Sequence, residues 1–311
     1  MTYSIQSLKE QFTAGALSKA EFIKQALQLH DHLFDYVGIT RQTDVSEIHI
    51  STDGVRFLFG DENIWLFAPP REGRVAPIEV MNFGRYEPDE NRVMEILSEC
   101  SLQILDVGAN IGWYATRFAK RSPASKVYAF EPMPVSHKYL QRNVAINGVS
   151  DRVFCYNYGL SDASGSFDFF IAPTGSTNAS LLNVAANVDA RAVVGLTLTL
   201  DQWCLNHQVC PDFVKCDVEG AELLVFRGGF QTFSEHRPIV FCELLRKWSK
   251  PFGYHPNDVL VYFSELGYEC FAVGQAGVRR IEVITDETLE SNYAFLHRAK
   301  HVDMIQKLEI L

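Results

Sequence analysis

Apolar positions along the chain fall into two recurring patterns, which predict strands and helices in alternation. Short apolar runs typical of buried strands begin at Leu102, Val153, Phe213 and Pro238. Between them lie stretches with apolar residues three or four positions apart, typical of helices that pack by one face. Because strands that alternate with helices form a parallel sheet covered on both faces, this central part predicts an α/β fold.

The first 40 residues carry a purely helical pattern. Ser18 and Glu21 have the spacing of a capping box, ahead of an apolar face that includes Ile23, Leu27 and Phe34. We expect a helical segment that packs on the main domain or on a second subunit, which gives a possible homodimer through the N-terminal helices. A lid or a carrier-docking module is the alternative.

The pattern changes to a period of two after residue 40, with turn signals at Asp53-Gly54 and Gly60-Asp61. This predicts a small β meander ahead of the main domain. We therefore divide the chain into four segments: 1–40 (helical), 41–89 (meander and accessory region), 90–300 (main domain) and 301–311 (tail).

Composition narrows the class of protein. The chain has 311 residues, of which 47% are hydrophobic and 21% charged, with a net charge of −10. Because no long basic run is present, we expect no nucleic-acid partner. Neither a signal peptide nor a membrane-spanning apolar run is apparent. The seven cysteines are scattered without a Cys-x-x-Cys motif, which favours a reduced, cytoplasmic protein.

The strongest chemical signal is a strand, glycine turn, helix, strand and acid between Leu102 and Pro132. Gly108 and Gly112 allow a close backbone approach to a ligand, and the helix that follows points free N–H groups at it. Glu131 ends the second strand, where it is placed to accept hydrogen bonds from two ribose hydroxyls. The unit is typical of proteins that bind an adenosine-containing cofactor.

Two cofactors fit that geometry. A nicotinamide dinucleotide needs a third glycine, which the Gly108-x-Asn110-x-Gly112 pattern lacks. The Asp106 carboxylate, just before the turn, would repel a pyrophosphate but suits an ammonium or a sulfonium. The sequence therefore favours S-adenosylmethionine, with S-adenosylhomocysteine as its product.

Further polar residues are expected at the same edge of the sheet. Glu87 precedes the cofactor unit, and Asp162 follows the third strand, where it is placed to accept from an adenine amino group. Asp217 and Glu219 follow the fourth strand, at the start of a helix, and His255 lies in a loop on that side. A long polar loop over 172–195 is expected to serve binding.

Several motifs together resemble the FkbM family of S-adenosylmethionine-dependent methyltransferases, over about residues 80–275. They are Gly84-Arg-Tyr-Glu-Pro88, Leu105-Asp-Val-Gly-Ala-Asn-Ile-Gly112, Tyr128-Ala-Phe-Glu-Pro132, the helix with Leu140, Asn143 and Asn147, Leu160-Ser-Asp162, Leu198-Thr-Leu-Asp201, Lys215-Cys-Asp-Val-Glu-Gly-Ala-Glu222, and Arg237-Pro238 with Glu243. Residues 1–75 carry no pattern of this family.

The resemblance implies a Rossmann-like, seven-stranded class I methyltransferase sheet with helices on both faces. It also implies roles for individual residues. Asp106, Gly108, Asn110 and Gly112 would line the methionine and ribose, with Glu131 on the ribose hydroxyls, Ser161 and Asp162 beside the adenine, and Asp217 and Glu219 facing the transferred methyl group. Glu87 and Asp217 are included among the cofactor-binding residues, and Asp217, Glu219 and His255 are the candidate catalytic residues.

The family also implies methyl transfer, most often to a hydroxyl of a sugar, polyketide or other natural product, with peptide or amine nitrogen as the alternative. The acceptor is expected to be a small molecule or a peptide. Because a hydroxyl is a weak nucleophile, a base or a metal must take its proton. A metal is considered unlikely. A nicotinamide-dependent oxidoreductase and a non-catalytic S-adenosylmethionine-binding module are the rival classes.

Overall fold

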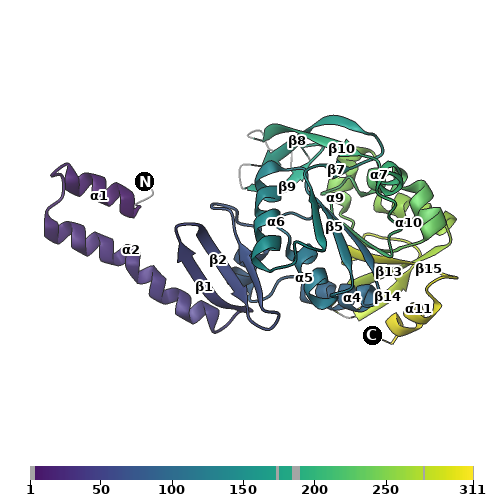
Figure 1. Cartoon of the computed structure of the whole chain (residues 1–311), viewed down its shortest axis with the longest axis horizontal. Coiled ribbons are helices and arrows are strands. Elements are labelled where there is room, and N and C mark those ends of the chain that lie inside the picture. The colour runs from purple at the N-terminus through teal and green to yellow at the C-terminus, as the bar shows by residue number, and fades with distance from the viewer. Residues whose placement is uncertain (1–3, 173–174, 184–189, 276, 311) are drawn as a thin grey trace.

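A computed structural model of the chain describes residues 4–172, 175–183, 190–275 and 277–310. It has a rounded body with a helical hairpin projecting from one side (Figure 1). The hairpin consists of α1 (Ile5–Thr13) and α2 (Lys19–Thr40), and the body contains all the other elements.

A large sheet organises the body. Among the described residues it has eight strands in the order β14-β13-β15-β12-β11-β4-β5-β6. Their bounds are β4 (Gln103–Val107), β5 (Lys126–Phe130), β6 (Val153–Tyr156), β11 (Phe213–Cys216), β12 (Ile239–Glu243), β13 (Tyr268–Gly274), β14 (Gly277–Ile281) and β15 (Asn292–His297). Strands β6, β5, β4, β11 and β12 pair in parallel, whereas β15, β13 and β14 pair antiparallel.

Seven of these strands have the arrangement that the sequence resemblance implied. The edge strand β14 was not expected. It forms a hairpin with β13, where Gly274 lies opposite Gly277. Its sequence, Gly277-Val-Arg-Arg-Ile281, does not alternate between apolar and polar residues, so it lacks the pattern by which a strand is predicted.

Helices cover both faces of the sheet. One face packs against α4 (Pro88–Ser98), α5 (Trp113–Arg121), α6 (Pro134–Ile146) and α11 (Val302–Leu308), and the other against α7 (Leu200–His207), α8 (Glu222–Arg227) and α10 (Pro256–Glu265). Side chains alternate between these two cores along a strand: Ile239 and Phe241 belong to the first core, Val240 and Cys242 to the second. The doubly wound α/β fold expected from the sequence is confirmed.

The helical hairpin of α1 and α2 is called the arm. The region between the arm and the large sheet contains a three-stranded antiparallel sheet. Its strands are β1 (Val45–Ser51), β2 (Gly54–Phe59) and β3 (Ile64–Phe67), which confirms the meander. A helix that the sequence pattern did not predict, α3 (Ala76–Phe83), follows it. Phe57, Phe59 and Leu66 share a core with α5 and α6, so the meander packs directly on the main body.

Two asparagines of α6 hold the free edge of the meander. Asn143 accepts from the Phe67 N–H (2.7 Å) and donates to the Phe67 carbonyl (3.2 Å) and to the Ile111 carbonyl (2.8 Å). One turn later, Asn147 makes the same pair of bonds to Trp65, at 3.0 and 2.6 Å. Two side chains four residues apart on one face of α6 thus bond to two backbone positions two residues apart on one edge of β3. The asparagines replace the neighbouring strand that β3 lacks.

A second sheet lies over one end of the body, with the order β7-β10-β8-β9. It contains β7 (Gly159–Leu160), β8 (Gly165–Ala172), β9 (Gly175–Ser180) and β10 (Arg191–Leu198). The long loop expected over 172–195 is therefore wrong in part, because β9 and the first half of β10 pair with β8 there. Residues 173–174 and 184–189 of that prediction lie outside the described residues.

Two remaining sequence observations have structural counterparts. In the part of the chain described here, no helix combines the length and the apolar character needed to cross a bilayer. All seven cysteines are free thiols, and Cys204, Cys216, Cys242 and Cys270 are buried.

Replacing Asn143 tests the clamp on the meander. Asn143→Ala removes three hydrogen bonds of a fully buried side chain and leaves the Phe67 N–H without its partner. We expect the free energy of unfolding to fall by about 2–4 kcal/mol, measured by urea denaturation. The control is Asn206→Ala, which removes an exposed hydrogen bond to Gln202 and should change stability by less than about 0.5 kcal/mol. Equal stability of the two variants would contradict the role of the clamp.

Candidate functional site

A cavity of about 520 Å³ opens at the carboxyl ends of the central strands. Its position is the switch point between β4 and β11, where the strand order of the sheet reverses and where doubly wound proteins bind ligands. Its size is within the range of roughly 300–1,000 Å³ that is usual for small-molecule sites. Its lining includes Arg74, Tyr86, Glu87, Gly108, Asn110, Tyr114, Glu131, Phe169, Lys215, Asp217, Glu219, Glu243, Lys247 and Trp248.

The glycine turn between β4 and α5 forms one wall. Gly108, Asn110 and Gly112 all have positive φ angles, of 81°, 48° and 89°. A Cβ on Gly108 would lie 1.8 Å from the Asp217 carbonyl oxygen, and one on Gly112 would lie 2.7 Å from the Leu140 side chain. The two glycines are therefore required by packing within the protein itself, in addition to any approach to a ligand. Gly108 lines the cavity, whereas Gly112 does not.

Glu131 ties this turn to the end of β5. Its carboxylate accepts from the Asn110 N–H (2.9 Å) and from the Met133 N–H (2.8 Å), while it still lines the cavity. Burial raises the pKa of Glu131 to about 7, against the lowering effect of these two bonds. The second lone pairs of the carboxylate oxygens remain available to a ligand.

Asn110 offers an independent sign of a polar ligand. Its side-chain oxygen is buried and has no hydrogen-bond partner among the described residues, although the residue lines the cavity. A buried acceptor without a partner is costly, so the site fits a ligand that donates a hydrogen bond there. The amino and hydroxyl groups of S-adenosylmethionine are such donors, and Asn110 and Glu131 are the residues that would hold them.

A buried lysine, Lys215, lies in the wall of the cavity. The Lys215 Nζ is 3.3 Å from Asp217 Oδ2, 3.7 Å from Asp106 Oδ1 and 3.2 Å from the Gly108 carbonyl. Burial lowers the pKa of Lys215, but the carboxylates of Asp217 and Asp106 outweigh it, so that the pKa lies above its usual value. Lys215 therefore stays charged and fixes Asp217 at the end of β11.

Asp106 has a different position from the one that the sequence suggested. It is fully buried and does not line the cavity. Burial raises the pKa of Asp106, and the ammonium of Lys215 opposes that rise. In this structure its charge partner is Lys215, so its role toward a sulfonium or an ammonium stays a prediction.

Four carboxyl groups line the cavity together: Glu87, Asp217, Glu219 and Glu243. Burial raises the pKa of Glu87 to about 7 and that of Glu219 well above its usual range. Burial, and after it the nearby Asp217, raises the pKa of Glu243 to about 8. Because several acids share one cavity, ionisation of one makes ionisation of the others less favourable. Some of these acids can therefore remain protonated near neutral pH.

The third acid of the Asp217–Glu222 segment has a structural role. Glu222 accepts from the Val218 and Gly220 N–H groups, both at 3.1 Å, and from the Tyr254 hydroxyl, also at 3.1 Å. It thereby closes the turn that carries Glu219, which has a φ of 58°. A left-handed conformation at a residue other than glycine is strained, and such strain is concentrated at functional sites.

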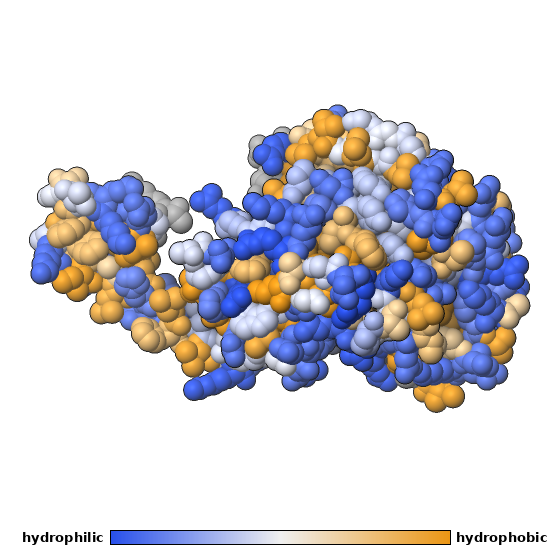
Figure 2. Space-filling view, in the orientation of Figure 1, coloured by the Kyte–Doolittle hydropathy of each residue, from blue (hydrophilic) through white to orange (hydrophobic). Residues whose placement is uncertain are grey.

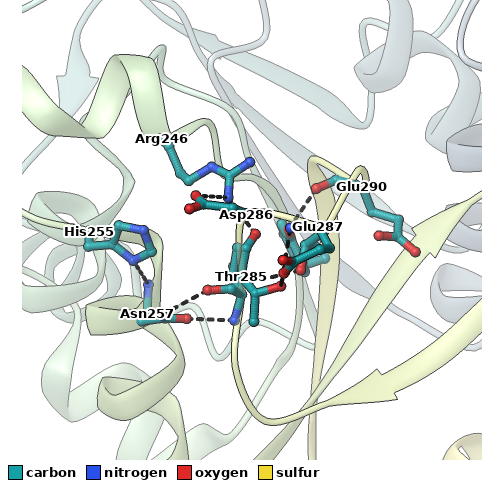
Figure 3. Close-up of polar contacts among 10 residues, drawn as sticks. Arg246, His255, Asn257, Thr285, Asp286, Glu287 and Glu290 are labelled. Carbon is teal, nitrogen blue, oxygen red and sulfur yellow. Dashed lines mark hydrogen bonds and ion pairs between the residues drawn. The ribbon is translucent and has the colours of Figure 1, made fainter.

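His255 lies apart from the cavity. It is exposed, is absent from the cavity lining, and caps α10 by accepting from the Asn257 N–H at 3.2 Å (Figure 3). The Asn257 side chain in turn bonds to the Ile284 backbone. His255 therefore belongs to a helix cap that fixes a surface loop, and it does not line the cavity that contains the acids.

Ser161 and Asp162, which were predicted to flank the adenine, are also absent from the cavity lining. Ser161 is buried, and its hydroxyl donates to Asp162, whose side chain is exposed. Gly159 and Leu160, immediately before them, do line the cavity. Their contact with adenine stays a prediction.

Several lining residues were not identified from the sequence. A charged residue inside an apolar strand was the available signal for Lys215. Arg74, Lys247 and Trp248 come from loops and a short helix, α9 (Arg246–Ser249), which have no chemical pattern in the sequence. Within the described residues, no group of three or more histidine, cysteine or acidic side chains has an arrangement able to hold a metal ion.

The strand order, the glycine turn and the acid after β5 define the class I methyltransferase fold. Residues 106–270, more than half of the chain, match the family described as the methyltransferase FkbM domain. The chain therefore belongs to the FkbM methyltransferases, a family that depends on S-adenosylmethionine. The family expected from the sequence motifs is confirmed.

Three curated relatives have about the same degree of similarity. Methyltransferase sdnD of Sordaria araneosa is 28% identical over 50% of this chain and 69% of its own length. The 2-O-methyltransferase NoeI of Sinorhizobium fredii is 27% identical over 48% of this chain and 65% of its own length. The hexuronic acid methyltransferase AglP of Haloferax volcanii is 28% identical over 78% of this chain and 89% of its own length. For sdnD and NoeI, the similarity thus spans about two thirds of the relative.

The raised pKa values predict how stability depends on pH. The pKa values of Glu131 and Glu222 are raised by burial to about 7, above the value near 4.5 expected in the unfolded chain. The folded state then binds more protons, so stability falls as pH rises toward and through these values. Burial lowers the pKa of His301 to about 4, so this residue makes stability rise with pH. That rise ends near pH 6.5, the pKa of histidine in the unfolded chain.

We therefore expect the ligand-free protein to lose more than about 1 kcal/mol of stability between pH 6.5 and 8.5. Urea denaturation at both pH values measures it. Glu243→Gln, which removes one group with a pKa raised to about 8, should flatten the dependence. Stability that is constant or rises over this range would contradict the account.

Proposed function

We propose that this chain is an S-adenosylmethionine-dependent O-methyltransferase that acts on a hydroxyl of a sugar, polyketide or other natural product. One observation carries the proposal. In a chain of the FkbM family, one cavity is lined by both the cofactor-binding turn and a cluster of half-buried acids. The first part supports cofactor binding, and the second supports removal of a proton from an acceptor.

The acceptor class rests on relatives and on the cavity. NoeI and AglP are described as acting on oxygen at a 2-position and on a hexuronic acid, which favours a sugar hydroxyl here. Arg74, Lys247 and Trp248 line the cavity and offer hydrogen-bond donors and an aromatic face to a polar ring. Transfer to a peptide or amine nitrogen is the alternative, because the acid cluster also suits a cationic acceptor.

The rival classes have less support. A nicotinamide dinucleotide would bring a pyrophosphate to the turn, next to Glu131 and above the Asp106–Lys215 pair. A third glycine, which that cofactor needs, is lacking at the required spacing. A binding module without activity would have no need of the strained Glu219 and the acids around it.

When bound, S-adenosylmethionine supplies an electrophilic methyl group on a sulfonium. The residues of the chain must orient the acceptor and take its proton. Phe169 lines the cavity, and the Ser180 hydroxyl donates to the Glu219 carbonyl at 2.9 Å, which ties β9 to the acid cluster. Positioning of this kind accounts for a large share of the catalysis of a displacement reaction.

Glu243 is the acid that best suits the role of general base. Asp217 is already ion-paired with Lys215, and Glu222 is saturated with backbone donors. Glu243 ends β12 beside Asp217, and its carboxylate makes no hydrogen bond or ion pair with another described residue. It would accept the proton of the acceptor hydroxyl, so that this oxygen could take the methyl group that S-adenosylmethionine would supply. Asp217 and Glu219 would then position the acceptor and the sulfonium.

Calorimetry tests the cofactor. We expect S-adenosylmethionine and S-adenosylhomocysteine to bind in the micromolar range and NAD not to bind. Glu131→Gln removes charge-assisted hydrogen bonds and should weaken S-adenosylhomocysteine binding by about tenfold or more. The control is Glu265→Gln, an exposed acid of α10 outside the cavity, which should leave the affinity unchanged. Micromolar binding of NAD without binding of S-adenosylhomocysteine would refute the proposal.

The pH dependence of turnover tests the base, with methyl-labelled S-adenosylmethionine and a panel of sugar, phenol and amine acceptors. The rate should rise with pH as Glu243 loses its proton, because burial raises its pKa to about 8. Glu243→Gln should abolish that rise and lower kcat by roughly 100-fold or more, while S-adenosylhomocysteine binding is retained.

His255→Ala is the matched control for this experiment. It removes a side chain on the same side of the sheet that caps a helix outside the cavity, so turnover should stay within about twofold of wild type. A Glu243→Gln enzyme with an unchanged pH profile would eliminate Glu243 as the base. Methyl label found only in amine products would replace O-methylation by N-methylation.

A further inference from the structure

Glu87 is a half-buried acid of the cavity lining. Charged side chains normally stay in solvent, and the body is mainly hydrophilic on the face shown in Figure 2. Among the described residues, no cation forms an ion pair with Glu87. Because a carboxylate that is partly withdrawn from water is stabilised by a partner of opposite charge, its position suits a cationic group of a ligand.

The protein holds Glu87 in one conformation. The residue precedes α4 with a φ of 43°, a left-handed conformation that is strained outside glycine. The Tyr114 hydroxyl donates a hydrogen bond to the Glu87 carboxylate. The backbone just before it is also fixed, because the Asn91 side chain donates to the Tyr86 carbonyl. A group held in this way loses little conformational freedom when it binds a ligand.

Tyr114 connects Glu87 to the cofactor turn. It lies in the first turn of α5, two residues after Gly112. The Lys215 Nζ is 5.3 Å from the centroid of its ring, and the same ammonium donates to the Gly108 carbonyl. Glu87 therefore lies on the side of the cavity where β4 and β11 end.

The strand order indicates which part of the cofactor would meet Glu87. With its ribose at Glu131, after β5, the cofactor can extend in two directions along the edge of the sheet. Toward β6, the cavity is lined by Gly159 and Leu160, which have no charge. Toward β4 and β11, it is lined by Glu87. The charged amino-acid part of the cofactor fits the second direction.

The other acids near this position have different environments. Asp106, which the sequence suggested for an ammonium, does not line the cavity. Asp217 already has an ion pair, at 3.3 Å, with the buried lysine. Glu219 and Glu243 are assigned to the acceptor and the sulfonium in the proposed function. Glu87 is thus the acid best suited to the cofactor ammonium.

We propose that Glu87 holds the ammonium group of the methionine part of S-adenosylmethionine, and that Tyr114 is the positioning residue that fixes Glu87 for this contact. The inference rests on the proposed function, since it requires that cofactor in the cavity. It goes further by assigning one charged group of the cofactor to one carboxylate of the chain.

Calorimetry with two ligands tests the contact. S-adenosylhomocysteine has the ammonium group, whereas 5′-methylthioadenosine has the adenosine and the sulfur but lacks the amino-acid part. Glu87→Gln removes the charge and keeps an acceptor for the Tyr114 hydroxyl. It should weaken S-adenosylhomocysteine binding by about tenfold or more and leave methylthioadenosine binding within about twofold of wild type.

Asp89→Asn is the matched control, because Asp89 lies in the first turn of α4 and does not line the cavity. Both affinities should stay unchanged. Tighter binding of S-adenosylhomocysteine by Glu87→Gln would place Glu87 at the ligand carboxylate, and an equal loss for both ligands would indicate a structural role. Either result, or unchanged affinities, would overturn the inference alone. A wild-type protein that binds neither ligand would refute the proposed function as well.

Tyr114→Phe tests the positioning role, because it keeps the ring beside Lys215 and removes the hydroxyl. Burial raises the pKa of Glu87 to about 7, and the Tyr114 hydrogen bond opposes that rise. The ratio of S-adenosylhomocysteine affinity to methylthioadenosine affinity should therefore increase from about pH 6 to 8 in the wild type, as Glu87 loses its proton. In Tyr114→Phe the increase should move to higher pH. The other titratable groups around Glu87, unchanged in this variant, include Tyr86, Glu90, Lys215, Asp217 and Glu243.

Tyr128→Phe is the matched control for this variant. The Tyr128 hydroxyl donates to Gln103 at 2.8 Å, and Tyr128 does not line the cavity, so the pH dependence of the ratio should match wild type. A Tyr114→Phe protein with the wild-type pH dependence would overturn the role of Tyr114. A ratio that does not change with pH in the wild type would remove Glu87 from the contact.

Discussion

The site depends on how the structure compensates the buried ammonium of Lys215. An ammonium deep in a protein is tolerated only when neighbouring groups balance it. Lys215 meets that condition through Asp106, Asp217 and the Gly108 carbonyl, and these groups come from the ends of β4 and β11. The same contacts fix the glycine turn against β11, at a separation that no Cβ would allow. The cofactor wall and the acid-rich end of the cavity are thus positioned by one electrostatic arrangement.

A second set of polar contacts transmits order from the periphery to the cavity. Asn143 joins β3 of the meander to the Ile111 carbonyl in the glycine turn. Arg117 of α5, almost fully buried, is paired with Glu62 of the meander and Glu95 of α4, each at 2.6 Å. The accessory sheet, which the family match does not include, therefore supports the wall of the site. The described residues of the helical hairpin α1–α2 do not line the cavity.

The expectations that held rest on short-range patterns. Alternating apolar runs predicted the strands, and the Ser18–Glu21 capping box predicted the start of α2, because caps and periods involve residues only a few positions apart. The turn from Gly108 to Gly112 and the acid at Glu131 were found for the same reason. The expectations that failed involve long-range pairing. The polar segment after Ala172 forms β9 through its partner β8, and the edge strand β14 exists only beside β13.

The sequence by itself thus determined the fold class, the family and the position of the cofactor turn, since each depends on local motifs in a fixed order. Only the tertiary structure decided which acids share one cavity. It brought Glu87, Asp217 and Glu243 together from three separate segments and placed His255 in a helix cap outside them. It also showed that Asp106 is buried against Lys215. The physical reason is that charge, burial and proton affinity at a site are set by neighbours in space, which strand order and helix packing define.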